Sequence, residues 1–434
     1  MDKMADVLGR AGAWCGQNKY LSAIKNAFQN FMPLTIAGAI GVLWCNVLVN
    51  ESTGLGIFFK PIMALEFLNP AFQAVNFCTI SCITVGITLG IAQEIGVWNM
   101  GAEKAGYIPG LVGLAAWLSV TNTSHMVDGA KEAFTGIAGN ELGATGLFTG
   151  MIIGVLSVEL FCFFEKQDAL KIKMPEQVPP GVARAFEVLV PATITLIITA
   201  CIGSACYNLT GLYLNDVIKN GIQGPLGAVG ATIPGVMIIY LVIMLFWLVG
   251  IHGNNMLSAV KEALFTPLAL ENVEKFNKGE KPTNIINMYA LQMWGEFGGS
   301  GVTIGLVIAI MIFGKREDNK AIATLSLVPG LFNINETVTF GIPMVLNPIL
   351  GIPFVFACLV TILVGYVLTV IGFCPVACLT VPWTTPPIVF GFLACGANVM
   401  GAVTQAILIV VSTVIYVPFL ISYEKYQNKQ AAEA

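Results

Sequence analysis

The stretch "NINETVTFGIP", residues 333–343, decides the class of fold because it lies in the longest uncharged part of the chain. Glu336 is the only Asp, Glu, Lys, Arg or His between Lys320 and Glu424. A carboxylate at mid-membrane depth costs about 2.5–3.5 kcal/mol on insertion scales, so a carboxylate kept there usually has a ligand or a partner. The stretch therefore predicts a membrane protein with one functional carboxylate.

The composition agrees with a polytopic membrane protein. Of the 434 residues, 56% are hydrophobic and 11% are charged, whereas soluble domains carry about 25% charged residues. The net charge of −4 comes without a large basic patch, so the sequence excludes nucleic-acid binding. A span needs about 20 apolar residues. We expect an all-α polytopic membrane protein with about ten transmembrane helices, near residues 31–49, 72–96, 105–122, 142–164, 186–208, 231–250, 297–314, 321–335, 338–373 and 398–422.

Basic linkers predict the orientation of the chain. Residues 165–187, residues 314–320 and the tail after Glu424 carry Lys and Arg, so we place them and both termini in the cytoplasm. The loop 266–286 is also rich in Lys, although a single apolar segment separates it from 314–320. Simple counting would put these two loops on opposite sides, which is why we expect part of 251–300 to enter and leave as a hairpin.

Two regions contain residues that break helices. "GIHGNN" and "FTPLAL" interrupt 251–300, and four prolines lie in 372–396. Irregular backbone at membrane depth is tolerated where it is buried in protein or lines a wet cavity. We therefore predict re-entrant hairpins near 251–300 and 372–396, and broken segments of this kind indicate a transporter's binding site.

The expected domain organisation follows from these segments. It comprises a cytoplasmic or interfacial N-terminal helix without a cleavable signal peptide, an N-terminal transmembrane half that includes an interfacial amphipathic helix at 209–230, a substrate-binding half with both hairpins, and a cytoplasmic tail. The N-terminal helix covers residues 1–30, the N-terminal half 31–230, the substrate-binding half 231–423 and the tail 424–434.

Glu336 and His252 are the candidate catalytic residues. Glu336 is preceded by Asn333 and Asn335 and suits hydroxyl binding or proton acceptance, while the alternative is a structural carboxylate bonded to nearby amides. His252 ends an apolar run at a Gly-Ile-His-Gly turn, where Gly253 allows a ligand close to the backbone. An imidazole can bond a sugar hydroxyl, and the alternative is a capping histidine.

Aromatic and further polar residues complete the predicted site. Indole rings complement the C–H face of a pyranose, which suggests Trp383 and Trp247 as sugar contacts, the alternative being a membrane-interface belt. Glu296 is either a site residue or a marker of the membrane edge. The substrate-binding set that we predict is Trp383, Gly253, Asn254, Asn333, Asn335, Thr384, Trp247 and Glu296.

Other motifs point away from nucleotide or metal chemistry. Gly298, Gly299, Gly301 and Gly305 lie in an apolar span with no preceding strand, so we interpret them as helix-packing residues. The eleven cysteines lie mostly in apolar runs and are interpreted as small buried side chains. We expect no cofactor and no metal site.

Several stretches of this sequence resemble those of a known family. "FNINETVTFGIPMVLNPILGIPF" is similar to the hallmark of the enzyme IIC permeases of the phosphoenolpyruvate-dependent sugar phosphotransferase system, lactose/cellobiose/chitobiose branch. The resemblance extends, in order along nearly the whole chain, to "NAFQNFMPLTIAGAI", "MPEQVPPGVARAFEVLVPA", "LFWLVGIHGNN", "FGGSGVTIGL" and "VPWTTPPIVFGFLACGA".

The resemblance implies a function and partners. It implies a homodimer in membrane lipid, built through the N-terminal half, that translocates a β-linked disaccharide of the cellobiose, chitobiose or lactose type. The family's site carboxylate falls on Glu336, its histidine on His252 and its tryptophan on Trp383. A cysteine-phosphorylated IIB, supplied by IIA, would phosphorylate the sugar's 6-hydroxyl; IIA and IIB are expected as separate polypeptides, and the chain as a permease subunit in the bacterial cytoplasmic membrane.

One residue departs from the family, and two other functions compete. Thr337 follows the glutamate where the family usually has proline, which frees a backbone N–H and leaves the sugar unidentified. A proton-coupled secondary sugar transporter using Glu336 is the main alternative, and a membrane receptor is a third. A receptor would need a signalling domain, and the order of the motifs favours the permease.

Overall fold

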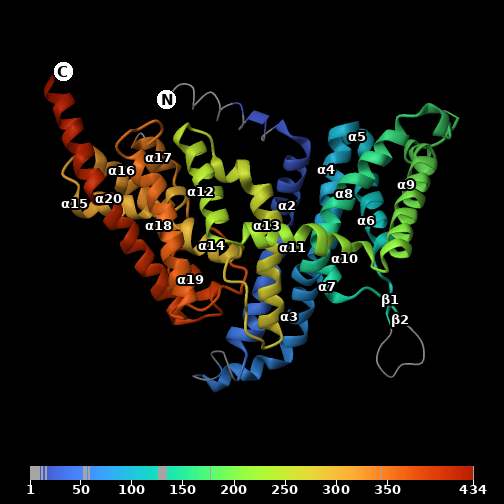
Figure 1. Cartoon of the computed structure of the whole chain (residues 1–434), viewed down its shortest axis with the longest axis horizontal. Helices are drawn as coiled ribbons and strands as arrows, with labels where there is room; N and C mark the ends of the chain where they lie inside the picture. Colours follow the sequence, from blue (N-terminus) through green and yellow to red (C-terminus); the bar gives the residue numbers. More distant parts are fainter. Residues whose placement is uncertain are drawn as a thin grey trace. The chain divides into compact units, whose positions relative to one another are not determined.

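The computed structural model describes residues 10, 13–14, 17–51, 56, 59–125, 134–175, 177–342 and 344–433. These residues are predominantly helical, and the one described sheet pairs β1 (Ser124–His125) with β2 (Phe134–Thr135) (Figure 1). The α-helices are α2 (Lys19–Leu43), α3 (Asn69–Asn76), α4 (Ile83–Met100), α5 (Ala102–Ala105), α6 (Ile108–Val120), α7 (Gly139–Leu142), α8 (Ala144–Glu165), α9 (Pro180–Thr210), α10 (Leu214–Ile218), α11 (Gly224–Gly230), α12 (Ile233–Leu248), α13 (Gly253–Asn277), α14 (Met288–Gly295), α15 (Ile304–Phe313), α16 (Glu317–Leu331), α17 (Glu336–Gly341), α18 (Gly351–Val370), α19 (Val389–Ala394) and α20 (Val399–Glu433).

Short π and 3-10 turns join or extend these helices. They are η1 (Trp44–Leu48), η3 (Lys60–Leu68), η4 (Phe77–Ser81), η5 (Asp168–Leu170), η6 (Lys219–Gln223) and η7 (Ser300–Val302). The predicted interfacial segment at 209–230 is helical from Leu214 to Gly230, through α10, η6 and α11.

Several helices are long and apolar enough to cross a membrane. Among the described residues there are five, or up to seven if each bent pair counts as one span: Lys19–Leu48, Ala144–Glu165, Pro180–Thr210, Gly351–Val370 and Val399–Glu433, plus the two pairs. The shorter apolar helices α6 and α12 come in addition. The all-helical membrane fold is thus confirmed, while the count of about ten spans stays a prediction.

The chain divides into two compact units, the first formed by Gln17–Gly38 and Ala74–Ala228. In it α4, α6 and α8 pack on one another. Glycine permits the close approach, because a Cβ at Gly150 of α8 would lie 2.2 Å from Thr88 Oγ1 of α4, and one at Gly113 of α6 would lie 2.3 Å from Ala92 Cβ.

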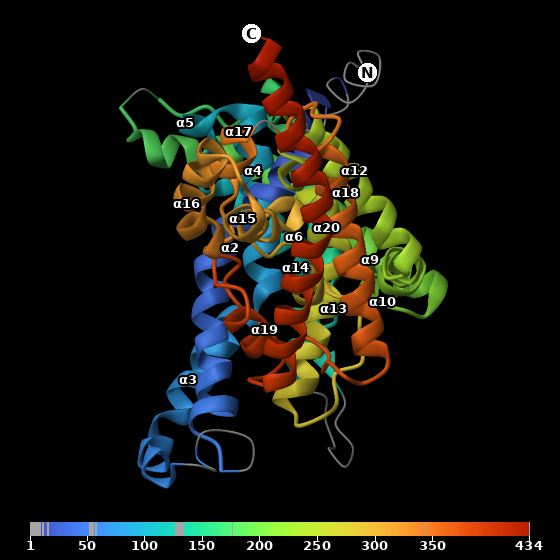
Figure 2. The ribbon, with the colours of Figure 1, turned by 90° about the vertical axis from the view of Figure 1, so that its left-hand side faces the viewer.

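The second unit combines Met1–Gly16, Ala39–Gln73 and Val229–Ala434 and contains every predicted site residue. The long helix α20 contacts α15, α18 and α19, and Figure 2 shows α18 running alongside it. A Cβ at Gly305 of α15 would meet Ser412 Oγ of α20 at 2.3 Å, so the interpretation of Gly305 as a helix-packing residue is confirmed.

The interpretation of the other three glycines was wrong. Gly298, Gly299 and Gly301 have φ angles of +68°, +86° and +76° and lie in a tight turn between α14 and α15. L-residues other than glycine rarely adopt such φ angles. The segment Met288–Val302, which includes this turn, meets Ile304–Phe313 at a bend of 60°.

The expected helix break at "FTPLAL" was also wrong. Helix α13 runs without interruption from Gly253 to Asn277 and includes Pro267. Proline removes one backbone donor, but Phe265, Pro267, Ala269 and Leu270 are buried, and we attribute the continuity of the helix to this packing. The breaks in and beside 251–300 lie at Val249–His252, as "GIHGNN" predicts, at 278–287 between α13 and α14, and between α14 and α15.

The helix break expected in 372–396 is confirmed, while the re-entrant hairpin there stays a prediction. Between the end of α18 at Val370 and the start of α19 at Val389 the chain forms turns and extended backbone, as its prolines require.

At the other end of the chain, α2 continues through Phe31 to Leu43, so the structure shows no helix break at the boundary we placed after residue 30. The domain boundaries stay predictions.

Candidate functional site

His252 lies at the start of α13, in the turn that follows α12. Gly250 adopts φ +80° and reverses the chain, and the Asn255 backbone N–H donates to His252 Nδ1 at 3.3 Å. The histidine therefore caps the helix, which was the alternative role considered from the sequence. The buried Trp247 ring lies 4.4 Å from the imidazole, centroid to centroid.

Gly253 serves close packing between helices. A Cβ at this position would lie 2.0 Å from the Ile243 carbonyl oxygen of α12, so only glycine fits there. The absence of a side chain thus holds the first turn of α13 against α12, and with it the position of His252.

Glu336 begins α17 and is exposed, with Asn335 as the residue before the helix. The negative charges of Glu336 and Glu296 and the positive charge of Lys261 all act on the His252 imidazole. Asn335, directly before Glu336, and Asn254, two positions after His252, both donate to Ser300, so the structure holds the two predicted catalytic residues, 84 positions apart in the sequence, on neighbouring loops.

Asn333 ties three loops together. Its backbone is left-handed, with φ +62°, a conformation that Asn tolerates better than most residues. Its Oδ1 accepts a hydrogen bond from the Gly298 N–H at 2.6 Å, and its Nδ2 donates to the carbonyls of Trp383 and Thr385. The amide therefore connects the Glu336 loop to the glycine turn between α14 and α15 and to the proline-rich loop before α19.

Asn335 and Asn254 meet at Ser300. Asn335 is 4% exposed, and its Nδ2 donates to the Ser300 carbonyl at 2.8 Å. Asn254, in the first turn of α13, donates to Ser300 Oγ at 3.1 Å, while its buried Oδ1 has no described partner. These amides position the loops around His252 and Glu336, and their predicted role as sugar ligands stays a prediction.

Trp383 and Thr384 lie in the proline-rich loop before α19. Trp383 is 45% exposed, whereas Thr384 is half-buried between two residues whose carbonyls bond Asn333. The tryptophan next to the histidine is different, because Trp247 is buried and its Nε1 has no described partner. The structure therefore favours Trp383 over Trp247 as an accessible ring.

Glu296 follows α14 and has two partners that we did not identify from the sequence. The Tyr240 hydroxyl donates to Glu296 Oε1 at 2.7 Å, and Lys261 forms an ion pair with the same oxygen. Lys261 lies in "VKEALF", and its charge inside a largely apolar segment was the signal that could have identified it. Among the described residues, no group of three or more His, Cys, Asp or Glu side chains is arranged to hold a metal ion.

Comparison with known proteins covers nearly the whole chain. Residues 25–358 match the family model described as "Phosphotransferase system, EIIC". The oligo-beta-mannoside-specific EIIC component of Bacillus subtilis (strain 168) is 32% identical, over 98% of this chain and 94% of that protein. The cellobiose-specific EIIC component of Lactococcus lactis subsp. lactis (strain IL1403) is 29% identical, over 98% of each chain.

A solved structure has the same fold. The crystal structure of the transporter ChbC, the IIC component from the N,N'-diacetylchitobiose-specific phosphotransferase system, matches with a TM-score of 0.88 and 29% identity, over 97% of each chain. The resemblance noted from the sequence is thereby confirmed. This chain belongs to the EIIC family, the membrane-embedded sugar permease components of the phosphotransferase system.

Proposed function

We propose that this permease translocates a β-linked disaccharide and presents its 6-hydroxyl for phosphorylation at the cytoplasmic face. The relatives support the substrate class, because their names specify oligo-β-mannosides, lichenan, cellobiose and lactose. The observation that carries the proposal is that the Glu336 loop and the His252 turn are both held at Ser300, to which Asn335 and Asn254 donate hydrogen bonds.

The hydrogen bond by which His252 caps α13 determines which of its ring nitrogens can donate to a ligand. Since Nδ1 accepts the Asn255 N–H, a neutral imidazole carries its proton on Nε2, which makes Nε2 a donor. We infer that His252 donates to the sugar's O6 or to an oxygen of the arriving phosphoryl group. Electrostatic stabilisation of this kind acts where charge develops in the transition state.

Glu336 supplies the complementary acceptor. Its exposed carboxylate would accept the 6-hydroxyl proton as the oxygen attacks phosphorus. In that step the S–P bond to the IIB cysteine breaks, the O–P bond forms, and the proton passes to Glu336. Trp383 would stack on the apolar face of a pyranose ring.

The partners follow from the same reaction. EIIC components work with IIA and IIB proteins, and a lactose-specific EIICB component of Streptococcus mutans serotype c (strain ATCC 700610 / UA159) matches 96% of this chain but 71% of its own length. We propose a phospho-cysteine IIB as donor, a homodimer built through the N-terminal half in membrane lipid, and cytoplasmic termini. The hairpins near 251–300 and 372–396 would bring the site within reach of IIB.

Vesicle uptake tests the proposal. Membrane vesicles containing the chain are supplied with purified IIA, IIB and the general phosphotransferase proteins, and cellobiose uptake is measured with and without phosphoenolpyruvate. We expect cellobiose 6-phosphate to accumulate only with phosphoenolpyruvate, and Glu336→Gln to lose phosphorylation by about 100-fold or more. Accumulation of unmodified sugar on a proton gradient alone would replace the proposal with a proton-coupled secondary transporter.

A further inference from the structure

A buried ion pair lies beside the residues assigned to phosphoryl transfer. Lys261 of α13 is only 5% exposed, and its Nζ contacts Glu296 Oε1. Tyr240 of α12, which is fully buried, donates to the same oxygen at 2.7 Å, and Lys261 Nζ lies 5.4 Å from the centre of the Tyr240 ring. Donors from two helices therefore hold one oxygen of one carboxylate.

The other oxygen of Glu296 is left available. The described hydrogen bonds and the ion pair of Glu296 all use Oε1, and the side chain is 18% exposed, compared with 6% for Lys261. The carboxylate is thus fixed on its buried side and accessible on the other.

Stability is a weak explanation for this arrangement. Taking two charges out of water costs several kcal/mol per ion, and apolar side chains of similar size often stabilise a fold as well or better. A buried pair is therefore better explained by a role in the site.

Glu296 also begins a turn that is bonded to the loops of both proposed catalytic residues. The charges of Glu296, Lys261 and Glu336 all act on His252. Glu296 opens the turn whose Gly298 N–H bonds Asn333 and whose Ser300 bonds Asn254. The position of its carboxylate is thus coupled both to the Glu336 loop and to the N-terminus of α13.

We propose that Lys261 and Tyr240 hold Glu296 as a second hydroxyl acceptor for the sugar, separate from Glu336. Glu296 Oε2 accepts a hydrogen bond from a sugar hydroxyl other than the one that is phosphorylated, and Lys261 acts as a positioning residue that orients the carboxylate. The inference rests on the proposed function and specifies how the site recognises its sugar.

The decisive variant removes both charges together. Lys261→Met/Glu296→Gln leaves no unpaired buried charge, and Gln can still accept from Tyr240. We expect the double variant to remain folded, with kcat for phosphorylation of cellobiose close to wild type. KM, and the Kd of cellobiose for the purified chain in equilibrium dialysis, should rise about 10- to 100-fold, since hydrogen bonds to charged groups contribute about 1.5–3 kcal/mol.

Monodeoxy cellobioses identify the hydroxyl. One analogue should raise KM in the wild type but cause no further rise in the double variant, because the partner is already lost. Glu262→Gln is the matched control, since this neighbouring carboxylate accepts from Thr266 and should leave KM unchanged. A similar rise in KM for Glu262→Gln would overturn the inference in favour of a general charge effect.

Other outcomes separate the two proposals. An active double variant with wild-type KM for cellobiose and all analogues would restrict the ion pair to folding and remove this inference alone. Absence of phosphoenolpyruvate-dependent phosphorylation in the wild type would remove the proposed function itself. If the double variant fails to fold, Tyr240→Phe tests the same point without changing charge: KM should rise about 3- to 10-fold, and an unchanged KM contradicts the inference.

Discussion

At the scale of single residues, His252 serves the backbone and the proposed substrate through different ring nitrogens. Nδ1 caps α13 and Nε2 is left as a donor. From the sequence, capping and ligand binding were competing interpretations of His252, because a motif does not show which ring nitrogen makes which hydrogen bond. The structure makes the two roles compatible.

A substitution at this position separates the two roles. Asn is among the best N-cap residues, so His252→Asn should retain the cap and keep the apparent Tm within a few degrees of wild type. The shorter side chain cannot place a donor where Nε2 lies, and kcat should fall about 100- to 1,000-fold. Radiolabelled sugar phosphate formation measures kcat, and His252→Ala, which should lose both stability and activity, is the comparison. Wild-type kcat in His252→Asn would show that only the cap matters.

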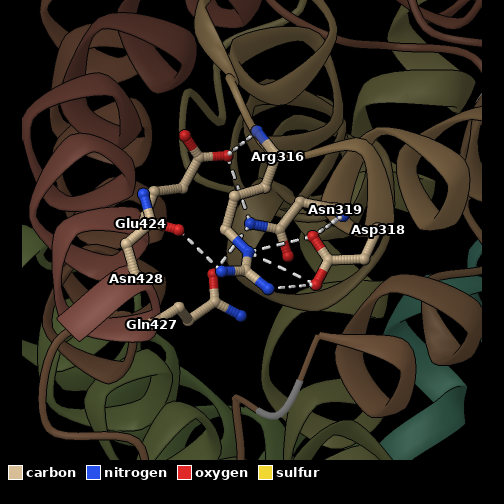
Figure 3. Close-up of polar contacts among 6 residues, drawn as sticks. All are labelled: Arg316, Asp318, Asn319, Glu424, Gln427 and Asn428. Carbon is tan, nitrogen blue, oxygen red and sulfur yellow. Dashed lines mark hydrogen bonds and ion pairs between the residues drawn. The ribbon is translucent and has the colours of Figure 1, made fainter. Parts of the chain in front are cut away.

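At the scale of elements, polar contacts attach α16 to the C-terminal part of α20. Figure 3 shows Glu424 of α20 facing Arg316 and Asn319 at the start of α16, and its carboxylate accepts from the Arg316 N–H at 3.3 Å and from Asn319 Nδ2 at 3.2 Å. The same carboxylate accepts from the Lys315 N–H at 2.8 Å. Backbone donors at a helix start need partners outside the helix. These contacts therefore fix the start of α16, the helix that leads through residues 332–335 to Glu336.

The stability of this attachment can be measured. Glu424→Gln removes the charge and one acceptor oxygen, and we expect a loss of about 1–3 kcal/mol because buried donors lose their partner. The purified protein in detergent should show a lower Tm in a thermal-shift assay. Glu433→Gln, at an exposed position on the same helix, should change stability by less than about 0.5 kcal/mol. Equal Tm values for both variants would contradict a structural role for Glu424.

At the scale of the whole molecule, the unit that contains the site should gain stability from its sugar. A ligand that binds only the folded state stabilises it by about 2.7 kcal/mol at 100 times its Kd. We therefore expect cellobiose or β-1,4-mannobiose to raise the Tm of the purified chain without any partner protein. The α-linked isomer maltose, at the same concentration, is the control and should leave Tm unchanged. A larger shift with maltose would contradict the β-linked substrate class.

The sequence by itself determined the family, the helical membrane fold and the breaks before α13 and α19. It also showed that Glu336 is the one charged residue of a long apolar run. These features depend on local composition and on short motifs in a fixed order, and both can be recognised in the sequence without knowledge of the fold. A lone charge in an apolar run and several prolines in one segment have local physical consequences, independent of the rest of the chain.

Only the tertiary structure decided which side chains share a partner. Glu296 lies 35 positions from Lys261 and 56 positions from Tyr240 in the sequence. Asn333 bonds Gly298, 35 positions before it, and Trp383, 50 positions after it. No periodicity encodes such pairs, because they depend on how the helices pack. Packing also explains why α13 continues through Pro267, since a buried environment can outweigh local helix propensity.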